Sequence, residues 1–140
     1  MTRMVTVLFA LLLAGSAAAA PAIHLQGGWA RAMPPVTKTT AGYVTVMNHG
    51  DADDVLLGAR VDGIRVVEIH EMVRDGDMLR MQRRESVAVP AGGSVQLAPG
   101  GLHLMLIDAQ QPLAAGGRLE GVLRFRDAGE VKVTLDLRAQ

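Results

Sequence analysis

The sequence predicts an all-β protein that folds as a single antiparallel β-sandwich or barrel. Hydrophobic and polar residues alternate with a period of two after residue 40, and turn sequences rich in glycine and proline recur. No segment after the first twenty residues keeps the periodicity of an amphipathic helix. Roughly seven to nine short strands in one chain of this size are typical of a sandwich domain.

Alternation and turn signals divide the chain into a series of expected strands. Residues 21–42 are expected to be mostly loop with at most a short strand, because Pro34 and Pro35 exclude a helix there. The last two strands form a hairpin across residues 127–130 and share one apolar face. We expect strands at 43–47, 55–61, 66–73, 78–84, 86–90, 94–98, 102–107, 119–126 and 131–137.

The amino-terminal segment has the layout of a secretory signal peptide. Arg3 is followed by an apolar stretch over 4–13 and by small residues up to Ala20. This stretch is too short for a membrane span, and no cysteine follows it, so we expect neither membrane insertion nor a lipoprotein anchor. The predicted organisation is a signal peptide at 1–20 and one exported, monomeric domain at 21–140.

Charge and cysteine content exclude several classes of function. The chain carries 14 basic and 14 acidic side chains, which provides no electrostatic basis for binding nucleic acid. Because it has no cysteine, it has no disulfide, no thiol redox centre, no cysteine zinc site and no blue-copper site.

A histidine and three methionines surround one tight turn in the segment VVEIHEMVRDGDMLRM, residues 66–81. With Asp75-Gly76 at the tip of a type I′ hairpin, His70 lies directly across from Met81. Met72 shares their face, and Met78 points to the opposite one.

Two pairs of opposite charges support this register of the hairpin. They place Arg74 across from Asp77 and Glu71 across from Arg80. A slip by one residue would lose both pairs.

A second histidine and methionine follow in GGLHLMLID. His103 and Met105 are two residues apart on an expected strand, so they share one face while leucines occupy the other. Imidazole and thioether are ligands that favour Cu(I), whereas Zn prefers thiolate, imidazole or carboxylate. Cu(II) prefers nitrogen and oxygen donors, so its binding would recruit water or another histidine, for which His24 is a weak candidate.

The spacing of these residues resembles the H-x10-M-x21-H-x-M motif of the PCuAC family of periplasmic copper chaperones. The resemblance extends over WARAMPP, AGY, VVEIHEM, VPAGG and APGGLHLMLID. It implies a cupredoxin-like fold, a mononuclear copper site at His70, Met81, His103 and Met105, and periplasmic delivery of copper to cytochrome c oxidase assembly. The partners it implies are the copper-site subunit of the oxidase or other copper-assembly factors. Met72 is an additional ligand candidate.

Several alternatives stay open beside the chaperone. A copper-storage or resistance protein would need the same ligands, and a copper enzyme or a plain ligand-binding sandwich would not need transfer at all. We expect no enzymatic activity, because no acid–base pair accompanies the motif. Glu68 shares the face of His70 and is a candidate to support that ligand without binding the ion, but its expected role is solubility. His49 is expected to be a solvated turn residue.

Overall fold

The computed structural model describes residues 15 and 17–139. In this part of the chain all regular structure is β, and no helix is long and apolar enough to cross a membrane. Most of the predicted signal peptide falls on residues 1–14 and 16, outside the described residues. The ten strands are β1 Ile23–Arg31, β2 Thr40–Asn48, β3 Asp54–Val61, β4 Ile64–Asp75, β5 Met78–Arg84, β6 Val87–Val89, β7 Ser94–Leu97, β8 Leu102–Ala109, β9 Arg118–Phe125 and β10 Gly129–Arg138.

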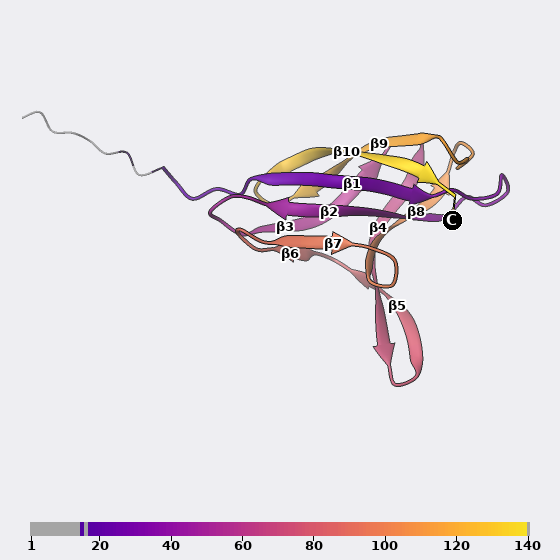
Figure 1. The fold of residues 1–140 in the computed structure, drawn as a ribbon, viewed down its shortest axis with the longest axis horizontal. Coiled ribbons are helices and arrows are strands. Elements are labelled where there is room, and N and C mark those ends of the chain that lie inside the picture. The colour runs from indigo at the N-terminus through magenta and orange to yellow at the C-terminus, as the bar shows by residue number, and fades with distance from the viewer. Residues whose placement is uncertain (1–14, 16, 140) are drawn as a thin grey trace, which may run out of the picture.

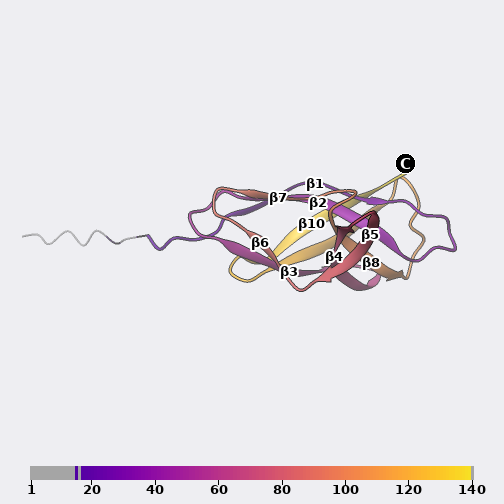
Figure 2. The same ribbon diagram turned by 90° about the horizontal axis from the view of Figure 1, so that it is seen from below.

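The strands form one curled sheet in the order β5-β4-β8-β2-β1-β10-β9-β3-β6, with β7 pairing to β2 (Figure 1). Contacts between β3 and β4 bring the two ends of this order together, so the sheet closes around its core as a flattened barrel (Figure 2). The hairpin of β4 and β5 extends away from the barrel (Figure 1). The all-β, single-domain prediction is confirmed, although β1 and β10 pair in parallel.

The expectation that residues 21–42 are mostly loop is wrong, because β1 is a nine-residue strand. Its alternation is interrupted by Gly27, which has a φ of +68°, and the register with β2 shifts between Gln26 and Trp29. A glycine-dependent bulge of this kind changes the direction of a strand. The amino-terminal part of β1 therefore pairs with β2, while Trp29 also pairs with Asp136 on β10.

The predicted carboxy-terminal hairpin is confirmed, and its apolar face lies in the core. Val131 pairs with Leu123, and Val133 with Gly121. Leu123, Phe125 and Val133 are buried among the inward side chains of β2, β3 and β8. Alternation was sufficient to predict which residues of this hairpin point inward.

A buried carboxylate connects the start of β3 to the loop between β9 and β10. Asp54 accepts backbone hydrogen bonds from Val55 at 2.8 Å, Asp127 at 2.9 Å and Ala128 at 2.9 Å. Burial raises the pKa of Asp54, but these hydrogen bonds and the charge of Arg126 outweigh it, so the pKa lies below its usual value. Asp54 therefore stabilises the fold in its ionised form.

We expect Asp54→Asn to lower the free energy of unfolding by about 1–3 kcal/mol at neutral pH, because one amide hydrogen then faces a backbone donor. The folded pKa is lower than the unfolded one, so the contribution of Asp54 is full above about pH 4 and is lost as the pH falls further. Urea unfolding at several pH values should show a smaller loss of stability on acidification in the variant. The exposed Asp62→Asn is the control, and an equal effect there would contradict the prediction.

Candidate metal centre

The turn of the β4–β5 hairpin differs from the predicted one. The two residues at its tip are Gly76 and Asp77, and Asp75 pairs with Met78. Gly76 has a φ of +62°, and glycine at the first central position is the requirement of a type II′ turn. The Asp-Gly sequence predicted a type I′ turn one residue earlier, and this prediction is wrong.

The correct register changes the partner of His70 but not its face. His70 pairs with Arg83, and Met81 pairs with Met72. Each cross-strand partner moves by two residues, which preserves the alternation of faces. His70, Met72 and Met81 therefore still share one face of the hairpin, with His70 diagonal to Met81.

The predicted charge pairs of the hairpin are replaced by diagonal ones. Arg80 contacts Asp75 at 3.1 Å, and Arg84 contacts Glu71 at 3.2 Å. Such partly exposed ion pairs contribute only about 0–1 kcal/mol each, so they do not determine the register against a favourable turn.

On the edge opposite to β5, β4 pairs with β8. His70 pairs directly with His103, and their ring centres lie 5.9 Å apart. Met72 donates a backbone hydrogen bond to Gly101 at 3.2 Å, and beyond this point β4 leaves β8 to form the projecting hairpin. The two histidines of the motif therefore meet at the base of the hairpin. The family resemblance implies that both bind one ion, but no local pattern of the sequence predicted their direct pairing.

His103 is held in one orientation by the backbone. Its side chain is buried, and its Nδ1–H donates a hydrogen bond to the carbonyl oxygen of Gly101 at 3.0 Å. This bond assigns the proton to Nδ1, so Nε2 carries the free lone pair. A histidine fixed in this way is ready to bind a metal ion through Nε2.

His70 is oriented by a carboxylate. Its Nε2–H donates to Oε2 of Glu68 at 2.7 Å, and its buried Nδ1 has no hydrogen-bond partner among the described residues. The hydrogen bond from His70 lowers the pKa of Glu68, partial desolvation opposes this, and the charge of Arg83 adds to it. Glu68 is therefore ionised at neutral pH, and as the acceptor it keeps a proton of His70 on Nε2. The role expected from the sequence for Glu68 was solubility, which does not include this contact with His70. The only sign of the contact in the sequence is that Glu68 lies two residues before His70.

The methionines lie in the rows next to the histidine pair. Met72 and Met81 face each other one row toward the hairpin tip, and Met105 pairs with Glu68 one row the other way. Met81 is 49% exposed, whereas Met72 and Met105 are half-buried. All of the predicted ligand residues thus share one face of β5, β4 and β8. Met78 lies on the opposite face of the hairpin and is exposed.

The donors gathered here are two imidazoles and three thioether sulfurs. In the described part of the chain, no three His, Asp or Glu side chains come together as a metal site, so the thioether sulfurs are the further side-chain donors available at this face. This composition suits a soft ion and does not suit Mg or Ca, which require oxygen ligands.

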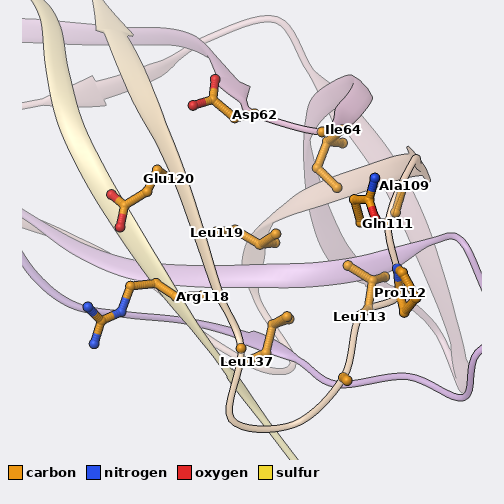
Figure 3. A pocket seen from close by; sticks show the side chains of 13 residues that line it. Asp62, Ile64, Ala109, Gln111, Pro112, Leu113, Arg118, Leu119, Glu120 and Leu137 are labelled. Atoms are coloured by element: carbon orange, nitrogen blue, oxygen red, sulfur yellow. The ribbon is translucent and has the colours of Figure 1, made fainter.

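An apolar pocket of about 440 Å³ lies at the other end of β4 and β8. Side chains that include Ile64, Leu113, Leu119 and Leu137 surround it (Figure 3). Its lining contains none of the predicted ligand residues. The pocket and the histidine–methionine face are therefore separate features.

Known proteins with related sequences match most of this chain. The family model of LpqE-like putative lipoproteins matches residues 23–137. The putative lipoprotein Lxx21020 of Leifsonia xyli subsp. xyli is 30% identical over 120 residues, which are 85% of this chain and 71% of that protein. The uncharacterized protein RP573 of Rickettsia prowazekii is 28% identical over 110 residues, covering 76% of this chain and 61% of that protein.

Solved structures show the same fold. The copper-bound PCuAC domain from PmoF2 matches with a TM-score of 0.72 and 28% identity, over 84% of this chain and 93% of that domain. The Cu(I) form of DR1885 from Deinococcus radiodurans matches with a TM-score of 0.64 and 27% identity, over 80% of this chain and 75% of that protein. The resemblance to PCuAC proteins is confirmed, including the cupredoxin-like fold. The chain therefore belongs to the LpqE-like family and has the fold of PCuAC domains.

Proposed function

We propose that this protein is an exported copper metallochaperone that binds one Cu(I) ion as its cargo and passes it to another protein. The observation that carries the proposal is the buried, unpartnered Nδ1 of His70 beside His103. A buried nitrogen without a hydrogen bond is unfavourable by about 1–3 kcal/mol. A metal ion bound at this nitrogen removes the penalty.

We assign the ligand roles to Nδ1 of His70, Nε2 of His103 and the sulfurs of Met81 and Met105. Met72 faces Met81 directly, which makes it an equally well-placed donor, and the two sulfurs can exchange in the coordination sphere. Thioethers need no deprotonation, and a set of neutral soft donors favours Cu(I) over Cu(II) and Zn. Cu(II) at this face would need water as a further ligand.

The exposure of the site favours transfer over storage. His103 is buried and the side chain of His70 is 16% exposed, whereas Met81 is 49% exposed at the base of a projecting hairpin. A partner can approach from the side of Met81 and exchange its own ligand for the thioether. We propose that the protein acts in the periplasm on the copper-site subunit of cytochrome c oxidase or on another copper-assembly factor, without catalysing a reaction. The lipoprotein descriptions of its relatives support export.

The test is a competition titration with Cu(I) and a chromophoric chelator under anaerobic, reducing conditions. We expect one tight equivalent, weakened by about tenfold in Met81→Ala, because Met72 on the facing strand compensates in part. The double variant Met72→Ala/Met81→Ala should bind far more weakly than either single variant. Met78→Ala is the matched control, since this methionine lies in the same hairpin on the opposite face.

Absence of tight Cu(I) binding by the wild type would refute the proposal. Equal weakening by Met78→Ala would show that the ligands lie on the other face. Transfer is tested separately, by mixing the Cu(I)-loaded protein with the soluble copper domain of an oxidase subunit. Retention of the ion in the presence of a tighter-binding acceptor would favour the storage alternative.

A further inference from the structure

A second pair of histidines lies at the start of β1 and the end of β2. His24 pairs across the strands with Met47, and His49 follows two residues later. The backbone N–H of His49 donates to the carbonyl oxygen of Ala22 at 2.8 Å, so the antiparallel alignment continues to this row. His24, Met47 and His49 therefore project from the same face of β1 and β2.

The two rings lie as close together as those of the motif histidines. Their centres are 6.1 Å apart, compared with 5.9 Å between His70 and His103. Two imidazoles that bind one ion through nitrogens at ~2.0–2.1 Å have ring centres roughly 5–6 Å apart. The rings of His24 and His49 are exposed, so small side-chain rotations suffice to bring them to this geometry.

We propose that His24 and His49 form a second copper site, which takes Cu(II) through two imidazole nitrogens and water. Met47 is half-buried between the strands and lies within reach as a weak axial donor. Exposure leaves room for water ligands, which suits the nitrogen and oxygen preference of Cu(II). No third His, Asp or Glu joins the pair as a metal cluster in the described residues, so a tetrahedral zinc site is incomplete here.

The second site is distinct from the first but lies on the same outer face of the sheet. Gly42 on β2 pairs with Leu104 on β8, and Met47 is five residues further along β2, roughly 17 Å at ~3.4 Å per residue. One ion cannot contact both histidine pairs. Ala41 pairs with Met105 and shares its face of the sheet. Alternate residues of a strand point to the same side, so Met47, six residues after Ala41, lies on that face as well. Both sites therefore lie on the outer face of the curled sheet.

The experiment uses the full exported chain without a histidine tag. Cu(II) is added to a His70→Gln/His103→Asn variant, in which the first site is disabled, and the copper EPR spectrum and affinity are recorded. We expect one bound Cu(II) with the hyperfine pattern of two nitrogens. Adding either His24→Gln or His49→Gln should weaken binding by more than about tenfold and remove one nitrogen from the spectrum.

Unchanged Cu(II) affinity in the His24→Gln/His49→Gln variant would overturn the proposal. Loss of all ordered Cu(II) binding in His70→Gln/His103→Asn would overturn it as well, because Cu(II) would then occupy only the first site. A Cu(I) titration of His24→Gln/His49→Gln keeps the two proposals apart. Full Cu(I) affinity there supports independent sites, whatever the outcome with Cu(II).

Discussion

Replacing His103 by asparagine should lower the affinity for Cu(I) by more than roughly a hundredfold while leaving the fold intact. Removing a group that only orients a metal ligand already lowers metal affinity by about 10–100-fold, and here the ligand atom itself is lost. The amide nitrogen of asparagine occupies nearly the position of Nδ1 and can still donate to the carbonyl of Gly101. Only Nε2, the nitrogen with the free lone pair, is lost. The measurement is the anaerobic competition titration, together with thermal unfolding of the metal-free variant.

His70→Gln is the corresponding change on the facing strand. Its amide nitrogen can still donate to Glu68, while the unpartnered Nδ1 is removed. We expect the same loss of Cu(I) affinity and no loss of stability, because a buried nitrogen without a partner is no longer present. Tight binding in both variants, with the unfolding temperature unchanged, would contradict the assignment of the two histidines as ligands.

Glu68→Gln should weaken Cu(I) binding by roughly 10–100-fold although Glu68 does not touch the ion. The ionised carboxylate accepts a 2.7 Å hydrogen bond from Nε2 of His70, which fixes the tautomer and raises the electron density at Nδ1. A neutral amide accepts a weaker bond and can rotate to present its NH₂ group instead. The ring of His70 then loses its fixed orientation.

The matched control for this change is Glu71→Gln. Glu71 is on the same strand, also contacts an arginine, and points to the opposite face. It should leave the Cu(I) affinity unchanged. Separate recording of the on- and off-rates adds a readout that a general loss of stability would not reproduce, since weaker orientation should act mainly by speeding release. Equal effects of the two substitutions would mean that charge alone, and not the contact with His70, determines the affinity.

The β4–β5 hairpin illustrates how far local sequence reasoning extends. The alternation of side chains correctly placed His70, Met72 and Met81 on one face of the hairpin. The predicted register was wrong, but each cross-strand partner moved by two residues, so the faces did not change. The error itself arose from the sequence Asp75-Gly76-Asp77, which satisfies a type I′ turn at one position and a type II′ turn at the next. Exposed charge pairs were too weak to distinguish them.

The sequence by itself determined the all-β class, the inward face of the last hairpin, and the chemical character of a histidine–methionine site without thiolates. These properties depend on the period of two and on residue type, both of which are local. Only the tertiary structure decided that His70 pairs directly with His103 and that β1 is a full strand paired in parallel to β10. Such contacts join segments that are far apart in the chain, and their choice depends on how the whole sheet closes around its core. A single sequence has no local signal for them.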